Sequence, residues 1–204
     1  IVVYGASGFT GRLVAEYLAG RRGEPTRWAM AGRDTAKLAA VRDEIGAPRD
    51  VPLIAADAAQ LQSLRDLATR TRVVLTTVGP YQLYGSDMVA ACAETGTDYV
   101  DLCGEPAWMR AMIDAHDAEA KKNGARIVFS CGFDSIPFDL GVLFLQTEAR
   151  KRFGKPFARV KGRVRKMRGT FSGGTAASLK ATLAAAARDP NVVALLKDPF
   201  SLTP

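Results

Sequence analysis

The sequence has few of the residues that bind metals or form cross-links. Its 204 residues include one histidine and three cysteines, and no two cysteines form a C-x-x-C pair. The histidine, His116, has no cysteine close to it in the sequence, so we expect no metal site. The odd set of cysteines, Cys92, Cys103 and Cys131, suits reduced thiols and therefore predicts a cytoplasmic protein.

Long apolar runs are missing as well. The longest extends from Ile136 to Leu145, and it contains Asp139. It has about half of the ~20 residues that a membrane-spanning helix needs. Low-complexity tracts and internal repeats are also absent. These absences indicate a globular chain without a membrane span.

Acidic residues are scarce in one segment only. Residues 148–168 contain ten Lys or Arg and a single acid, Glu148, whereas the rest of the chain has 18 basic and 20 acidic residues. The net charge of +7 therefore belongs to this segment. No aromatic stacking groups accompany its basic face, so nucleic acid is a poor candidate partner.

The first eleven residues are the most informative part of the chain. A short apolar run leads into Gly5-x-x-Gly8-x-x-Gly11, and a helical pattern follows at once. Glycines so placed allow a tight turn, a close approach of the backbone to phosphates, and close packing of the helix on the strand. The helix N-terminus then presents free N–H groups to the anion.

This glycine pattern predicts a dinucleotide site, although an ordinary strand–turn–helix is the alternative. The spacing departs from the usual G-x-G-x-x-G, because Ser7 stands where that motif has glycine. The hydroxyls of Ser7 and Thr10 can donate to phosphate oxygens. The predicted phosphate-binding residues are Gly5, Ser7, Gly8, Phe9, Thr10 and Gly11.

Strand and helix patterns alternate along the first 130 residues, which indicates parallel βαβ units. Strands are expected at residues 1–4, 27–31, 51–55, 72–77, 99–102 and 126–130. Helices are expected at residues 9–20, 35–45, 60–70, 86–95 and 106–122. Six such strands make a doubly wound parallel Rossmann sheet, so we predict an α/β fold with a dinucleotide-binding domain over residues 1–135.

The pattern changes after residue 135. We expect a helix at 137–152, a half-buried strand with one cationic face at 157–171, and an Ala-rich helix at 175–187. Residues 136–204 are thus interpreted as the start of a second α+β domain, for substrate binding or oligomerisation. The sequence begins inside a strand and ends on Ser201-Leu-Thr-Pro204, so we expect it to be truncated at both ends.

The end of the second strand bears on the choice of cofactor. An NAD enzyme places Asp or Glu there to accept the ribose 2′-hydroxyl, whereas this chain has Gly32-Arg33. Arg33 can pair with a 2′-phosphate and stack on adenine, and Lys37 adds charge one helical turn later. NADP is therefore favoured over NAD. The alternative is that Arg33 is a solvated surface residue and that Asp34 only caps the helix.

The ends of the third and fourth strands complete the predicted cofactor site. Asp57 follows the third strand, where it either touches the adenine or caps the next helix. After the fourth strand, Val78, Gly79 and Pro80 turn the chain beside the nicotinamide ribose.

A proton donor is harder to identify than the cofactor site. The Tyr-x-x-x-Lys pattern of short-chain dehydrogenases is absent. Tyr81 and Asp134 are the best catalytic candidates, and a structural role is an equal alternative for each. Cys131 is a weaker candidate, for which a small buried side chain is the plainer interpretation.

Several stretches together resemble the saccharopine dehydrogenase-like oxidoreductase family. They are GASGFTG at 5–11, AGR at 31–33, VGPYQLYG at 78–85, YVDLCGE at 99–105, CGFDSIPFDLG at 131–141 and SGGTAAS at 172–178. Within this family the chain is most similar to the trans-acting enoyl reductases of actinobacterial lipid synthesis. Members of the family are longer than this chain, which agrees with the expected truncation.

The resemblance implies an NADPH-dependent reduction of a small or carrier-bound acyl substrate. Hydride would go to the β-carbon of an α,β-unsaturated thioester and a proton to the α-carbon. The basic strand 159–168 can then attract an acidic acyl carrier protein. Alternatively, this basic strand is a solvated face of a sheet, or it forms an interface with the rest of the polypeptide or with a second subunit in a homo-oligomer.

Two other functions remain open at this point. The first is a saccharopine-type amino-acid dehydrogenase, whose substrate carboxylates would need arginines near Tyr81 and Asp134. The sequence has none next to those motifs. The second is an NADP-binding regulatory module without turnover, which the scarcity of acid–base residues keeps open.

Overall fold

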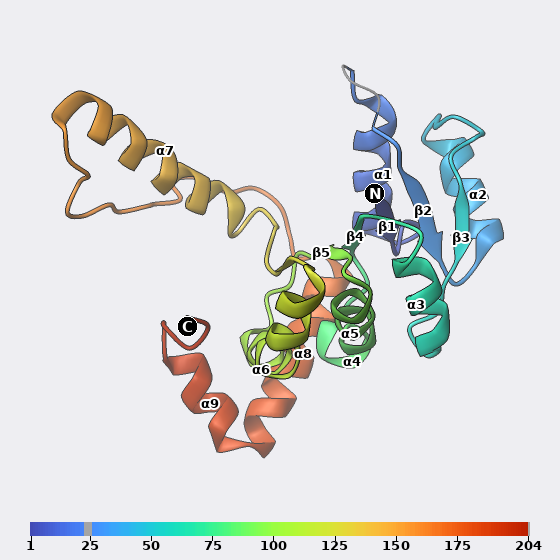
Figure 1. The fold of residues 1–204 in the computed structure, drawn as a ribbon. Helices are drawn as coiled ribbons and strands as arrows, with labels where there is room; N and C mark the ends of the chain where they lie inside the picture. The colour runs from blue at the N-terminus through green and yellow to red at the C-terminus, as the bar shows by residue number, and fades with distance from the viewer. Residues whose placement is uncertain (23–25, 204) are drawn as a thin grey trace.

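The computed structural model describes residues 1–22 and 26–203, so Pro204 of the predicted second domain lies outside the described residues. It contains a six-stranded parallel sheet with the order β3-β2-β1-β4-β5-β6 (Figure 1). The strands are β1 (Val2–Tyr4), β2 (Ala29–Gly32), β3 (Leu53–Ala55), β4 (Val73–Thr76), β5 (Asp98–Val100) and β6 (Ile127–Val128). The order reverses between β1 and β4, as in dinucleotide-binding sheets. The predicted doubly wound α/β fold is confirmed.

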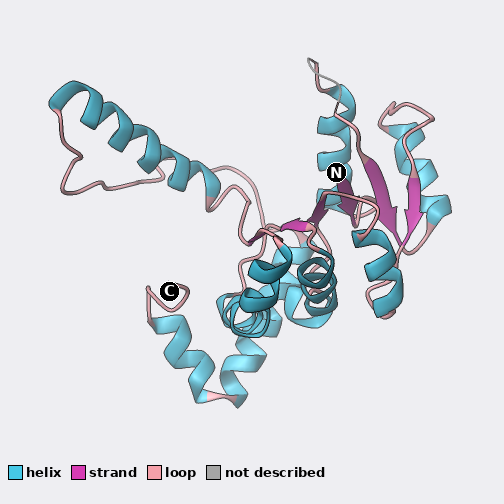
Figure 2. Ribbon diagram, viewed as in Figure 1, coloured by secondary structure: helices cyan, strands magenta, loops and turns pink. Residues whose placement is uncertain are grey.

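Helices cover both faces of this sheet (Figure 2). They are α1 (Phe9–Gly20), α2 (Thr35–Glu44), α3 (Leu61–Ala68), α4 (Tyr81–Tyr84), α5 (Ser86–Thr95) and α6 (Pro106–Asn123). Neighbouring residues of a strand enter different apolar clusters: Val3 packs with the side chains of α1 and α2, whereas Val2 and Tyr4 pack with those of α3, α5 and α6. Burial on both faces explains why the strands are continuously apolar in sequence.

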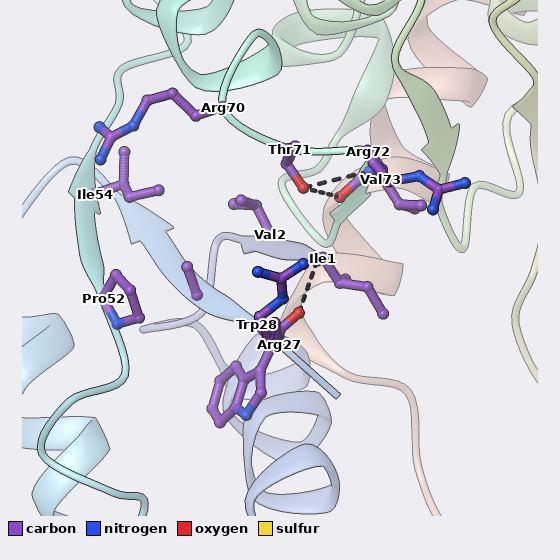
Figure 3. Close-up of a pocket in the computed structure, with 11 residues that line it drawn as sticks. Ile1, Val2, Arg27, Trp28, Pro52, Ile54, Arg70, Thr71, Arg72 and Val73 are labelled. Atoms are coloured by element: carbon purple, nitrogen blue, oxygen red, sulfur yellow. Dashed lines mark hydrogen bonds between the residues drawn. The ribbon is translucent and has the colours of Figure 1, made fainter. Parts of the chain in front are cut away.

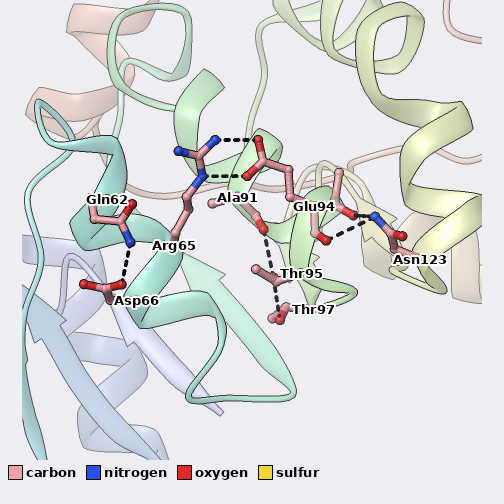
Figure 4. Close-up of polar contacts among 9 residues, drawn as sticks. Gln62, Arg65, Asp66, Ala91, Glu94, Thr95, Thr97 and Asn123 are labelled. Atoms are coloured by element: carbon pink, nitrogen blue, oxygen red, sulfur yellow. Dashed lines mark hydrogen bonds and ion pairs between the residues drawn. The ribbon is translucent and has the colours of Figure 1, made fainter.

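Polar contacts hold α3, α5 and α6 together at the side of the sheet (Figure 4). Arg65 donates two hydrogen bonds to the Glu94 carboxylate, at 2.6 and 2.9 Å. The buried Thr97 hydroxyl donates to the Ala68 carbonyl at 2.9 Å. The Asn123 amide donates to carbonyls at the end of α5, at 3.0 and 3.1 Å. These bonds link the three helices, whose apolar side chains pack with Val74 of β4 and Tyr99 of β5.

The predicted elements of the first 130 residues are all present, with ends within two residues of the expected ones. The one-turn helix α4 was not predicted. Four residues are too few to show a helical period in the sequence, so nothing in the pattern marks α4.

Three further helices follow the sheet. They are α7 (Ile136–Phe153), α8 (Gly173–Arg188) and α9 (Pro190–Lys197). Figure 1 shows α7 extending away from the body of the sheet, whereas α8 passes close to α4 and α6. The predicted helices at 137–152 and 175–187 are therefore confirmed, and α9 is an addition. Among the helices of the described residues, none combines the length and the apolar character of a membrane span.

The predicted half-buried strand at 157–171 is wrong. The backbone of this segment forms neither helix nor strand, and from Arg159 to Phe171 only Val160 is even half-buried. A strand is stable when a neighbouring strand takes up its backbone hydrogen bonds. In the described part of the chain no strand lies beside this segment, so its alternating pattern has no partner.

Candidate functional site

The loop between β1 and α1 is built around two glycines. Gly5 has a φ of +87°, in the left-handed region that favours glycine. A Cβ at Gly11 would lie 2.1 Å from the Gly5 carbonyl oxygen, and a Cβ at Gly5 would lie 2.8 Å from Thr77 Oγ1. The turn therefore excludes a side chain at both positions and brings α1 against the end of β1.

The N-terminus of α1 has unsatisfied hydrogen-bond donors. Its N-cap residue Gly8 has no side chain to cap the helix, and the Gly8 N–H donates to the Gly5 carbonyl at 2.9 Å. The first turn of α1, which is fully described, contains no acidic residue. Free N–H groups and the positive end of the helix dipole make this end of α1 suitable for an anion.

A cavity of about 350 Å³ opens at the carboxyl ends of the central strands. The loops that follow β1, β2, β3 and β4 form its walls, as expected for a ligand site in an open α/β sheet. Seven of the twelve residues predicted to bind the cofactor line it: Gly5, Ser7, Gly8, Arg33, Asp57, Val78 and Gly79.

The other five predicted residues do not line the cavity. Gly11 acts through packing, because its missing side chain lets α1 approach the loop. Phe9 is 74% exposed, Thr10 is half-buried and Pro80 is buried. Lys37 is exposed on α2. Their contact with a cofactor stays a prediction.

Arg33 lies at the cavity edge, directly after β2. It is exposed, and a Cβ at the preceding Gly32 would have no atom closer than 3.6 Å. The Asp34 carboxylate accepts the Lys37 N–H at 3.0 Å, which confirms that Asp34 caps α2. The Lys37 ammonium lies 3.9 Å from the same carboxylate. Among the described residues that line the cavity, Arg33 is the cationic one.

Asp57 shapes the wall of the cavity on the β3 side. Its carboxylate accepts the Ala59 N–H at 3.0 Å, while its own N–H donates to Ser63 Oγ at 3.0 Å. The carboxylate thus stabilises the turn before α3, whose N-cap is Gln60. Asp57 is placed both to hold this turn and to face a ligand.

Two tyrosines line the cavity although they were not predicted to do so. Tyr4 is buried at the end of β1, and burial, followed by the charge of Asp57, raises its pKa to about 12. Tyr84 is half-exposed at the end of α4. The sequence could have indicated Tyr4, since it directly precedes the first glycine of the loop. It could not have indicated Tyr84, because the position of Tyr84 depends on the unpredicted helix α4.

The two predicted proton donors lie outside this cavity. The Tyr81 hydroxyl is buried, donates to the Thr76 carbonyl at 3.2 Å and accepts the Leu102 N–H at 3.4 Å. Burial, followed by the charge of Asp101, raises the pKa of Tyr81 far above its ordinary value. Asp134 is exposed in the loop between β6 and α7. Neither is among the described residues that line the cavity.

A buried carboxylate joins the ends of β5 and β6. Asp101 accepts hydrogen bonds from the Tyr99 hydroxyl at 2.8 Å, the Cys103 N–H at 3.0 Å and the Ser130 N–H at 2.8 Å. Burial raises the pKa of Asp101. Cys131, the residue after Ser130, is half-buried. Within residues 1–22 and 26–203, no cluster of three His, Cys, Asp or Glu is suited to a metal ion.

A larger hollow, of about 610 Å³, lies at the opposite edge of the sheet (Figure 3). Arg27, Trp28, Arg70 and Arg72 line it, around the amino ends of β1, β2 and β4. Ligands of this fold bind outside the carboxyl ends of the strands, where the glycine loop is. The smaller cavity is therefore the candidate cofactor site.

Comparison with known proteins agrees with this geometry. Residues 1–128 match the family model described as saccharopine dehydrogenase NADP binding domain. A protein of Mycobacterium tuberculosis is 48% identical over 205 residues, and the trans-acting enoyl reductase of Mycobacterium ulcerans is 45% identical over 205 residues. Each alignment covers 100% of this chain and 49% of the relative, so the chain spans about half the length of these relatives.

A solved structure supports the fold. The saccharopine dehydrogenase (L-Glu forming) of Saccharomyces cerevisiae superposes with a TM-score of 0.55 and 19% sequence identity. The superposition covers 74% of this chain and 31% of that one. At this identity the likeness concerns the backbone arrangement alone.

Proposed function

The chain belongs to the saccharopine dehydrogenase NADP-binding domain family, and on that premise we propose that it forms the cofactor-binding part of an NADPH-dependent enoyl reductase. The observation that carries the proposal is the cavity at the glycine loop, with the open end of α1 on one side and Arg33 on the other. Mycobacterial relatives at 44–45% identity are named trans-acting enoyl reductases, which supports an acyl thioester substrate in lipid synthesis.

The residues present fit a dinucleotide phosphate. Gly5 and Gly11 leave the space that a Cβ would fill, so the loop can hold a pyrophosphate against the N–H groups of α1. Ser7 would contribute its hydroxyl, and Arg33 would pair with the 2′-phosphate that distinguishes NADPH. Val78 and Gly79 line the same cavity and would border the nicotinamide ribose. When bound, the cofactor supplies the hydride, and the chain supplies position and a proton path.

Asp134 and Tyr81 are the candidate proton donors of this reaction. Asp134 is exposed in the loop between β6 and α7, after the carboxyl end of a strand. The buried Tyr81 hydroxyl makes two hydrogen bonds to the backbone, and its proton is directed to the Thr76 carbonyl. These contacts favour a structural role for Tyr81 and leave Asp134 as the other candidate donor.

Exchange of Tyr81 for phenylalanine tests this assignment. We expect the free energy of unfolding to fall by about 1 kcal/mol, because the Thr76 carbonyl loses its hydroxyl partner. NADPH affinity and kcat should stay close to those of the unchanged protein. Denaturant unfolding measures the free energy of unfolding, and steady-state kinetics measures kcat and the KM for NADPH. A collapse of kcat at unchanged KM would make Tyr81 the donor.

We propose that residues after 135 belong to a second domain, which binds the substrate or joins subunits of a homo-oligomer. Helix α7 supports this, because its apolar side chains are uncovered: Leu140, Leu143 and Phe144 are 53%, 58% and 66% exposed. Apolar surface of this kind is normally covered by other protein or by a ligand.

The basic segment 159–168 is a candidate docking site for an acyl carrier protein. All of its Lys and Arg side chains are exposed, so they can attract an acidic partner. Reversing the charge at Arg163 and Arg165 should weaken carrier-protein binding, most strongly at low salt. Unchanged affinity over a salt series would exclude this docking site.

The activity itself can be tested with the full-length protein. NADPH oxidation is measured with a panel of α,β-unsaturated acyl thioesters and with saccharopine-pathway substrates. Turnover of an enoyl thioester is expected. Turnover of the amino-acid substrates would instead make the protein a saccharopine-type dehydrogenase, and NADPH binding without turnover on any of them would make it a regulatory module. A cytoplasmic location stays a prediction.

A further inference from the structure

Glu105 is a buried carboxylate that the proposed reaction does not use. It is 2% exposed and stands between β5 and α6. It is the N-cap residue of α6, but its side chain does not cap that helix, whose N-terminal residues are all described. The carboxylate is directed to other parts of the chain, where it has three hydrogen-bond partners.

Two of these partners are at the start of α4. The Tyr81 N–H donates to Oε1 and the Gln82 N–H donates to Oε2, each at 2.9 Å. Helix α4 begins directly after Val78, Gly79 and Pro80, two of which line the cofactor cavity. Because Glu105 holds both N–H groups of this first turn, it also fixes the backbone that forms the cavity wall.

The third partner comes from α8. The Ser178 hydroxyl donates to Glu105 Oε1 at 2.7 Å, across 73 positions of sequence. A longer contact of 3.5 Å joins the Gln82 amide to Thr182 Oγ1 on the same helix. None of the residues of α8, all of which are described, is buried. The bond between Ser178 and Glu105 is thus a direct polar attachment of α8 to the cofactor domain, in a region where Figure 1 shows α8 passing close to α4 and α6.

The space around α4 leaves it little freedom to adapt. A Cβ at Gly85, the residue after α4, would lie 2.8 Å from the Trp108 ring and 2.8 Å from the Tyr81 carbonyl. The Tyr81 and Trp108 rings are 5.5 Å apart. A close-packed helix moves as a unit, so a change at Glu105 reaches the cavity wall instead of being absorbed locally.

We infer that Glu105 is a positioning residue that couples the cofactor cavity to α8. Its carboxylate orients the wall at Val78 and Gly79 through α4, and it docks α8 through Ser178. The inference rests on NADPH binding in this cavity, and it does not depend on which substrate is reduced. By thermodynamic linkage, a cofactor that favours this wall geometry also favours docking of α8, and undocking of α8 weakens cofactor binding.

Substitution of Glu105 and Ser178 in the full-length protein tests the coupling. In Glu105→Gln the NH2 group of the amide is itself a donor, so it cannot accept a hydrogen bond from at least one of the three partners. We therefore expect the NADPH Kd to rise about threefold to tenfold. Ser178→Ala should raise it about twofold to fivefold. Ser178→Thr keeps the hydroxyl and should restore the original value. The Kd is measured by fluorescence titration, and thermal unfolding confirms that each variant is folded.

Hydrogen exchange distinguishes coupling from simple support of the fold. In the unchanged protein, NADPH should slow amide exchange in α8 (Gly173–Arg188), and in Ser178→Ala this response should be lost. Ser172→Ala is the matched control. Ser172 caps α8 by accepting the Thr175 N–H at 3.2 Å, so its loss loosens the same helix without touching Glu105. It should leave the NADPH Kd unchanged.

Three outcomes would overturn the coupling. They are unchanged NADPH affinity in both Glu105→Gln and Ser178→Ala, an equal effect of Ser172→Ala, and exchange in α8 that does not respond to NADPH. If Glu105→Gln fails to fold, the serine variants decide alone. Failure of the unchanged protein to reduce any enoyl thioester, with NADPH still bound, would contradict the proposed reaction and leave the coupling intact.

Discussion

Replacing Gly11 with alanine is expected to abolish NADPH binding and to lower the free energy of unfolding by about 3 kcal/mol. The new Cβ would lie 2.1 Å from the Gly5 carbonyl oxygen and 2.7 Å from its carbon. Both contacts are with backbone, so no side-chain rotation relieves them. Helix α1 would have to move away from the loop, which displaces the N–H groups that hold the phosphates. Denaturant unfolding and NADPH titration measure the two effects.

Gly20 provides the matched control for this change. It is the last residue of α1, and a Cβ there meets no described atom within 4 Å. Gly20→Ala should therefore leave NADPH binding unchanged and alter stability by no more than about 1 kcal/mol, in the stabilising direction. If Gly11→Ala bound NADPH as well as Gly20→Ala does, the glycine loop would not be the phosphate site.

Replacing Arg33 with alanine is expected to raise the Kd for NADPH by about tenfold to a hundredfold and to leave the Kd for NADH nearly unchanged. Arg33 is the cation that lines the cavity after β2, where an NAD enzyme has an acidic residue. Its guanidinium can form charge-assisted hydrogen bonds with a 2′-phosphate, and NADH has no such group. Titration with both coenzymes gives the ratio directly.

Arg70 serves as the control for net charge. It lines the hollow at the amino ends of the strands (Figure 3), so Arg70→Ala removes the same charge far from the cofactor. Affinity for both coenzymes should be unaffected. An equal loss of NADPH and NADH affinity in Arg33→Ala would contradict the assignment of the 2′-phosphate. The effect of Arg33 should also weaken as salt is added, because the side chain is exposed.

The sheet and the phosphate loop were predictable because their determinants are local. Each strand is a short apolar run between turn residues, and both faces of the sheet are buried. The first glycine has a positive φ, and the third lies against the backbone of the first. Both positions exclude a side chain, so they are visible in the sequence as glycines. The role of Arg33 was equally predictable, because Arg33 directly follows the end of a predicted strand.

The rest of the site was not predictable for a physical reason. Tyr84 reaches the cavity through a helix of one turn, which is too short to have a period in sequence. Glu105 caps α4 across 23 and 24 positions and receives Ser178 across 73, so no spacing rule relates these residues. At 157–171 the sequence predicted an element that is not formed. Its period-two pattern suits a strand, but no described strand pairs with it.

The amino-acid sequence alone was sufficient for the parallel order of elements, the glycine loop and the preference for NADP. These depend on contacts between residues close in the chain, or on rules that hold for every sheet of this topology. The tertiary structure decided which predicted residues meet in one cavity, that Tyr81 is bound to the backbone, and that Glu105 joins the cavity wall to α8. Those outcomes depend on contacts between residues far apart in the chain, which only the folded arrangement brings together.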